Sequence, residues 1–254
     1  MYTSPAMPLI PLESRFIYKP LRVGQVVGPG HDVKLETADG VTLHARYVLR
    51  PYAYFNLLYL HGRSGSLATR SRLLQYFVSV NANVLAVDYR GYGQSTGTPC
   101  EAGLYTDALT AYQWLVSHVP AQSVVVIGEG LGAAPACELA AAQPVAGLVS
   151  ISAFSSLPQL AAAHYPWLPT GWVVRSRFDV LDKIARVQAP KLIVHSRADE
   201  RVPFAMGERL FAAALEPKQA LWLDAAKHGE VYSTSGEQLK IGLEQFLATL
   251  DIPS

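Results

Sequence analysis

The chain has 254 residues, a length that fits one α/β domain or two small domains with a sizeable core. Half of its residues are hydrophobic and 16% are charged, which excludes an intrinsically disordered or fibrous chain. The formal net charge is +1, so no electrostatic attraction to nucleic acid is expected, and two cysteines are too few for a disulfide scaffold.

The apolar stretches of the chain are short. None approaches the roughly 18 to 20 residues that a transmembrane helix needs. The first 20 residues lack the basic-then-apolar pattern of a signal peptide. We therefore expect a cytoplasmic protein, with membrane association only through a segment that is not in this chain.

Apolar stretches typical of buried strands alternate with helical patterns along most of the sequence. The first pair of strands, residues 33–37 and 41–49, is expected to be antiparallel around an Asp39-Gly40 turn. Further strands are expected over residues 55–60, 83–88, 123–127, 145–151, 191–195 and 220–223, and helices over residues 67–80, 101–118, 131–142, 204–215 and 235–250. This order predicts a mostly parallel sheet with helices on both faces, which binds ligands at the carboxyl ends of its strands.

Residues 155–187 interrupt this alternation. They combine several prolines with Tyr165, Trp167 and Trp172, followed by a run that contains basic residues. We expect this stretch to form a small lid inserted after the strand at 145–151, within a single domain that spans residues 1–254. The three aromatic side chains are candidates for contact with an acyl or other hydrophobic ligand.

The most informative segment is GEGLG at residues 128–132, which connects a buried strand directly to a helix. The same strand–turn–helix setting presents the serine nucleophile in the motif G-x-S-x-G. The turn is so tight that the residues two before and two after its tip must be small, and both are glycine. The tip itself is Gly130, so the serine is missing. Such a tip has a positive φ that costs a non-glycine residue about 1–3 kcal/mol, whereas glycine adopts it freely.

Three more segments follow strands at the places where the same architecture needs them. The loop HGRSG at residues 61–65 could supply the amide of Arg63, which would pair with the amide of Leu131 to form an oxyanion hole. Asp199 follows the strand at 191–195, and His228 follows the last strand. The order of turn, acid and histidine is that of a Ser-Asp-His triad.

With these segments and DYRGYGQSTG at residues 88–97, the sequence resembles the α/β-hydrolases of the large serine hydrolase group, which includes serine aminopeptidase-like and acyl-thioesterase-like members. The resemblance covers about residues 30–250. It implies an α/β-hydrolase fold with an eight-stranded, mostly parallel sheet and a short helical lid, and it implies no cofactor. It also implies that Asp199 orients His228, that His228 is the general base, and that Arg63 and Leu131 form the oxyanion hole.

Gly130 departs from this family pattern. Covalent acyl transfer needs the missing hydroxyl, and loss of a triad serine costs on the order of 10⁶ in turnover. The first interpretation is therefore a hydrolase scaffold for esters, thioesters or peptides that is inactive or severely impaired, whether the glycine is natural or engineered. The alternative is a natural pseudo-hydrolase that binds an acyl or hydrophobic ligand or a protein partner. Whether the chain is an enzyme stays open at this point.

A dinucleotide-binding domain is a third possibility, because residues 128–133 also fit G-x-G-x-x-A. The sequence has no Asp or Glu between Glu138 and Asp179, where an acid that binds ribose would be needed. No His, Cys or carboxylate residues have metal-ligand spacing, so no metal site is expected. The identity of the substrate and the oligomeric state do not follow from the sequence.

Overall fold

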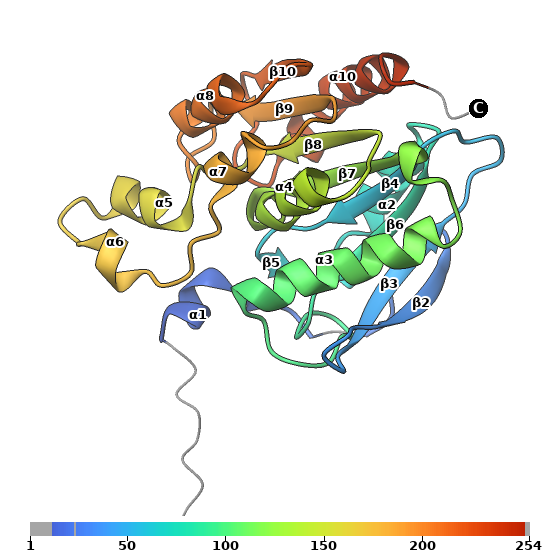
Figure 1. Cartoon of the computed structure of the whole chain (residues 1–254), viewed down its shortest axis with the longest axis horizontal. Helices are drawn as coiled ribbons and strands as arrows, with labels where there is room; N and C mark the ends of the chain where they lie inside the picture. Colours follow the sequence, from blue (N-terminus) through green and yellow to red (C-terminus); the bar gives the residue numbers. More distant parts are fainter. Residues whose placement is uncertain (1–11, 23, 252–254) are drawn as a thin grey trace, which may run out of the picture.

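The computed structural model of the chain describes residues 12–22 and 24–251 (Figure 1). Its centre is an eight-stranded sheet in the order β10-β9-β8-β7-β4-β6-β3-β2. The strands β2 (His31–Glu36) and β3 (Thr42–Val48) are antiparallel to each other, and β3 is antiparallel to β6. The other strand pairs of this sheet are parallel. The predicted fold class, a mostly parallel eight-stranded sheet, is confirmed.

The inner strands are buried on both faces, which explains why they read as continuous apolar runs. The remaining strands are β4 (Asn56–Leu60), β6 (Asn83–Asp88), β7 (Val124–Glu129), β8 (Gly147–Ile151), β9 (Lys191–Ser196) and β10 (Lys218–Leu223). Successive side chains point to opposite faces. Leu58 and Leu60 of β4 therefore join one hydrophobic core, and Leu57 and Tyr59 join the other.

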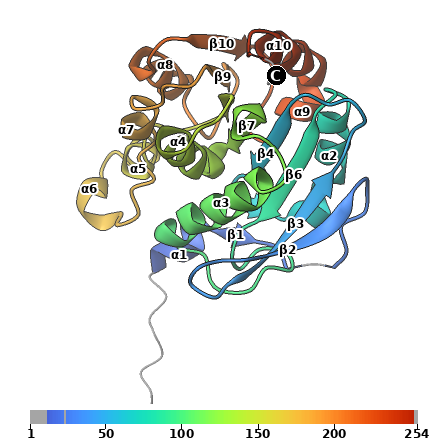
Figure 2. The ribbon, with the colours of Figure 1, turned by 45° about the vertical axis from the view of Figure 1, so that its right-hand side comes forward.

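Helices cover both faces of the sheet, with α3 and α4 on one side and α2 on the other (Figure 1; Figure 2). One core contains residues of α3 (Glu101–Val116), α4 (Ala133–Ala142), α7 (Val180–Ile184) and α8 (Phe204–Ala213). The other core contains residues of α2 (Ser71–Val78), α9 (Val231–Thr234) and α10 (Gly236–Ala248).

The helix predicted over residues 67–80 is divided. A 3₁₀ turn, η1 (Leu67–Thr69), is followed by a break at Arg70, where φ is −116° and ψ is 22°, and then by α2. The Arg70 guanidinium donates hydrogen bonds to the carbonyl oxygens of Ser64 at 2.6 Å and Ser66 at 3.2 Å. These bonds hold the chain in a tight loop that the spacing of apolar residues does not reveal.

The predicted lid, residues 155–187, contains two different parts. The helices α5 (Leu157–His164) and α6 (Thr170–Val173) project from one end of the molecule (Figure 1). The following stretch, which includes α7, packs into the core, where Phe178, Val180 and Val187 are fully buried. The exposed part of the predicted lid is therefore its α5–α6 half.

The parallel strands place their carboxyl ends at one edge of the sheet. The N-terminal segment lies at the same end of the molecule, with α1 (Leu12–Ile17) and a two-residue strand, β1 (Lys19–Pro20). The strand β1 pairs with β5 (Ser64–Gly65) in the loop that follows β4. The sequence did not predict this small sheet, because two-residue strands have no periodic pattern.

Candidate functional site

The turn between β7 and α4 is formed by η3 (Gly130–Gly132), with Gly130 at a φ of +53°. A Cβ atom on Gly128 would lie 2.6 Å from Ala133 Cα, and one on Gly132 would lie 2.2 Å from the carbonyl oxygen of Leu60. A Cβ atom on Gly130 would meet Gly62 Cα at 4.0 Å, which is an ordinary contact. Space therefore requires glycine on both flanks, whereas at the tip only the backbone conformation favours it.

The loop after β4 packs directly against this turn. Besides the approach of Gly62 to the tip, a Cβ atom on Gly62 would lie 3.4 Å from the carbonyl oxygen of Glu129. The carbonyl oxygen of Arg63 accepts hydrogen bonds from the Lys19 amide at 2.9 Å and the Tyr92 hydroxyl at 2.7 Å. Arg63 and Leu131, the predicted oxyanion-hole residues, thus lie on two segments that are held in contact.

His61 in the same loop is fully buried and packs against Tyr89 and Tyr92, with ring centroids at 4.6 and 5.0 Å. Burial, with a smaller contribution from the positive charge of Arg70, lowers the pKa of His61 to about 4, although Asp88 acts in the opposite direction. The imidazole is therefore neutral at pH 7. Its contacts make it part of the packing of the loop.

Asp199 and His228 are in contact, although they follow different strands. His228 Nδ1 lies 2.9 Å from Asp199 Oδ2, and Asp199 Oδ1 accepts hydrogen bonds from the amides of Arg201 at 2.9 Å and Val202 at 2.8 Å. Burial raises the pKa of Asp199, but the hydrogen bonds from His228 and from the two amides outweigh it, so the pKa lies below its ordinary value. The charged carboxylate can accept a hydrogen bond from an Nδ1–H of His228, and in that tautomer Nε2 carries the free lone pair.

Sequence reasoning missed a second contact between these two loops. The carboxylate oxygen Oε2 of Glu200 accepts a hydrogen bond from the backbone amide of His228 at 3.0 Å. Glu200 thereby fixes the backbone of His228, while Asp199 fixes its ring. The only sequence signal was the position of Glu200 directly after Asp199.

Glu129, beside the tip of the turn, is held from beneath by the sheet. The fully buried Tyr59 hydroxyl donates a hydrogen bond to Glu129 Oε2. Burial raises the pKa of Tyr59 well above its ordinary value, so the hydroxyl stays protonated and remains a donor. Tyr59 lies within an apolar run, which gave no sign of this contact.

Comparison with known proteins identifies the family. A family model described as the alpha/beta hydrolase fold matches residues 56–180. An uncharacterised protein of Mycobacterium tuberculosis strain H37Rv is 35% identical over 244 residues, which cover 92% of this chain and 87% of that protein. The chain belongs to the α/β-hydrolase fold family.

Other members of the α/β-hydrolase fold family are similar over most of the chain. Human alpha/beta hydrolase domain-containing protein 17B is 31% identical over 205 residues, which cover 79% of this chain and 70% of that protein. The solved structure of Pyrococcus furiosus esterase Pf2001 superposes with a TM-score of 0.75 at 22% identity, over 91% of this chain and 99% of that one. The latter similarity shows the shared fold. The resemblance stated from the sequence is confirmed at the level of the family.

The α5–α6 part of the predicted lid is attached to the loop that carries Asp199. His164 Nε2 at the end of α5 lies 2.7 Å from the carbonyl oxygen of Arg201. Tyr165 and Trp167 form an edge-to-face pair with centroids 5.7 Å apart, and both are exposed, as is Trp172. The lid thus lies beside the candidate site, but contact of these three side chains with a substrate remains a prediction.

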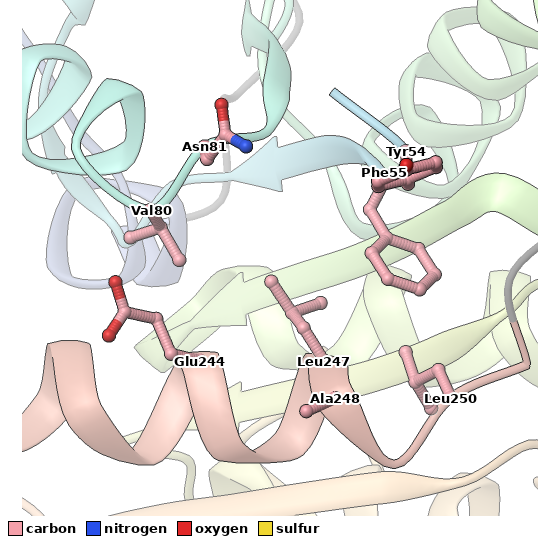
Figure 3. Close-up of a pocket in the computed structure, with 8 residues that line it drawn as sticks. All are labelled: Tyr54, Phe55, Val80, Asn81, Glu244, Leu247, Ala248 and Leu250. Atoms are coloured by element: carbon pink, nitrogen blue, oxygen red, sulfur yellow. The ribbon is translucent and has the colours of Figure 1, made fainter. Parts of the chain in front are cut away.

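A cavity of about 270 Å³ lies at the other edge of the α/β-hydrolase sheet (Figure 3). Its walls include Phe55, which precedes β4, Val80, which follows α2, and Leu247 of α10. Because Phe55 and Val80 precede β4 and β6 at the amino ends of these strands, the cavity is separate from the candidate site.

Residues 12–22 and 24–251 contain no group of three His, Cys, Asp or Glu side chains placed to hold a metal ion. Over the same ranges, no helix is both long enough and apolar enough to span a bilayer.

Proposed function

We propose that this chain is an α/β-hydrolase that retains the acid, the base and the oxyanion-hole loop of a serine hydrolase but lacks the nucleophile. With glycine at position 130, the chain is inactive or severely impaired in the hydrolysis of esters, thioesters or peptides. The observation that carries the proposal is Gly130, which holds the tip of the turn with a φ of +53° and leaves room for a side chain.

In this proposal, the residues around Gly130 have defined catalytic roles. The contact with Asp199 orients His228 to accept a proton through Nε2. The amides of Arg63 and Leu131 stabilise negative charge on the carbonyl oxygen of a bound ester or amide. Without a hydroxyl at Gly130, no acyl–enzyme bond forms, and the remaining groups supply about 10³-fold acceleration over water.

A second candidate function is ligand binding without turnover, by a natural pseudo-hydrolase in the cytoplasm. The exposed aromatic side chains of Trp167 and Trp172 favour it, because binding of an acyl ligand or a protein partner needs apolar surface and no nucleophile. In this case Gly130→Ser adds a side chain at the turn without producing turnover.

Hydrolysis of a short-chain p-nitrophenyl ester tests the main proposal. We expect negligible turnover by the unchanged chain and an increase of up to about 10⁶-fold for Gly130→Ser. His228→Ala, added to that variant, should remove the gain. Gly40→Ser is a matched control, because Gly40 also has a positive φ of +79° and open space but lies in the β2–β3 hairpin.

Two results would overturn the proposal. One is a folded Gly130→Ser protein with no activity, which would mean that the remaining groups are not a working site. The other is turnover by the unchanged chain that His228→Ala abolishes, which would reveal another nucleophile or an activated water.

A further inference from the structure

Large apolar side chains are exposed together at the end of the molecule that carries the lid. This group, here called the lid surface, comprises Phe16, Tyr165, Trp167, Leu168, Trp172 and Val173. Trp167 is 76% exposed and Trp172 is 89% exposed. Single exposed apolar residues are common on proteins, but a gathered group of them marks an interaction site.

The lid surface draws its residues from two segments that are far apart in the sequence. Helix α1 and the α5–α6 hairpin lie at the same end of the molecule in both views (Figure 1; Figure 2). The ring of Tyr18, directly after α1, packs edge-on against Phe178, with centroids 6.3 Å apart. The apolar residues of both segments therefore belong to one end of the fold.

Positive charge accompanies these apolar side chains. Residues 139–178 contain no Asp or Glu, and they include the exposed Arg175 and Arg177. Residues 12–22 contain one acidic residue, Glu13, and three basic residues, Arg15, Lys19 and Arg22. The nearby Glu101 accepts hydrogen bonds from the amides of Arg177 and Phe178 at 2.7 and 2.6 Å, so its carboxylate is engaged with backbone.

Exposed indole and phenol rings beside arginine and lysine are the side chains that settle at the boundary between lipid headgroups and acyl chains. Anionic lipids attract basic residues near the membrane surface. A second copy of the chain fits less well, because a symmetric contact would bring this positively charged patch against the same patch of the other copy. The basic residues beside the lid surface thus favour an anionic partner, and its exposed apolar side chains favour a partner with an apolar interior.

We propose that the lid surface docks this protein on anionic lipid membranes. The bond between His164 and the carbonyl oxygen of Arg201 links the docked helices to the loop of Asp199. Docking therefore turns the edge of the sheet that holds Asp199 and His228 toward the bilayer. The sequence led us to expect membrane association only through a segment outside this chain, because it could not show that these aromatic side chains are exposed.

The experiment uses the full, unchanged chain with vesicles of phosphatidylcholine alone or mixed with phosphatidylglycerol. We expect co-sedimentation with the mixed vesicles, a blue shift of tryptophan emission on binding, and weaker binding in high salt. Trp167→Ala combined with Trp172→Ala should weaken binding at least about tenfold. Arg177→Gln should weaken it about fivefold.

The matched control is Tyr52→Ala combined with Tyr54→Ala. It removes two exposed aromatic side chains that precede β4 and hence lie at the opposite edge of the sheet. This variant should bind mixed vesicles like the unchanged chain. No catalysis is required, so the result is independent of the fate of the proposed function.

Three results would refute docking on anionic membranes. The first is failure to bind mixed vesicles, and the second is equal binding to neutral vesicles. The third is a dimer in sedimentation velocity that the combined tryptophan replacement dissociates, which would assign the lid surface to a second copy of the chain.

Discussion

The three glycines of the β7–α4 turn should respond differently to alanine, because two different physical causes act on them. At Gly130 the cause is the left-handed backbone, which costs a non-glycine residue about 1–3 kcal/mol. Restriction of the unfolded chain returns about 0.4–1 kcal/mol. Since the new Cβ atom has open space, Gly130→Ala should lower the free energy of unfolding by about 1 kcal/mol.

At Gly132 the backbone is ordinary, with a φ of −65° and a ψ of −15°, so no conformational strain arises. The cost is a collision instead, because the Cβ atom would lie 2.2 Å from the carbonyl oxygen of Leu60 in the central strand β4. The backbone of a buried strand cannot relieve this collision by a rotamer change, as a side chain could. Gly132→Ala should therefore cost about 3 kcal/mol.

Urea unfolding of the two variants, with Gly171→Ala as the control, measures these costs. Gly171 lies in α6 with open space around it, so its replacement should be neutral or slightly stabilising. In thermal melts a difference of 2 kcal/mol corresponds to about 4–8 °C for a chain of this size. Equal destabilisation by Gly130→Ala and Gly132→Ala would refute the conclusion that a side chain fits at Gly130 but collides with backbone at Gly132.

Three further changes test the charged and buried groups. In the serine-bearing variant, Asp199→Asn should lower ester turnover about 10⁴-fold, because the histidine would lose its orienting carboxylate. His61 has a pKa of about 4 in the folded state and about 6.5 in the unfolded state. The unfolded chain therefore binds more protons, and stability falls as the pH drops from 6.5 to 4. His61→Gln should remove about 2 kcal/mol of the loss between pH 7 and pH 5, measured by urea unfolding, and an unchanged pH dependence would contradict the burial argument. Arg90, in the loop after β6, pairs with the buried carboxylate of Asp107 at 2.8 Å, and Arg90→Met should cost about 3–5 kcal/mol because it removes this countercharge. Arg186 forms a half-exposed ion pair with Asp182, and Arg186→Met should lower the free energy of unfolding by less than about 1 kcal/mol. Similar costs at Arg90 and Arg186 would contradict the importance of burial.

The buried parallel strands could be predicted from the sequence because both of their faces are apolar. The strand expected over residues 83–88 coincides with β6, and the turn at residues 128–132 lies where its glycines indicated. The short sheet of β1 and β5 and the break at Arg70 depend on bonds between segments or from a side chain to the backbone. Hydrophobic periodicity carries no information about such bonds.

The candidate site was predictable in its members and their order, but not in its supporting contacts. Asp199 and His228 could be selected because each follows a strand, while their separation of 2.9 Å is known only from the structure. Arg90 pairs with Asp107 on α3 and with Asp39 in the β2–β3 hairpin, and no motif indicates either contact. The exposure of Trp167 likewise depends on how the lid folds, so sequence alone could not distinguish a pocket wall from an outer surface.

Covalent labelling with a fluorophosphonate, read by intact-protein mass, tests most directly whether the site lacks only its nucleophile. Such probes react with an activated serine, which requires the base, its acid and the oxyanion hole to be in place. The unchanged chain should stay unlabelled, and Gly130→Ser should gain one adduct at position 130 that His228→Ala prevents. Labelling of the unchanged chain, or a folded Gly130→Ser protein without an adduct, would contradict the account.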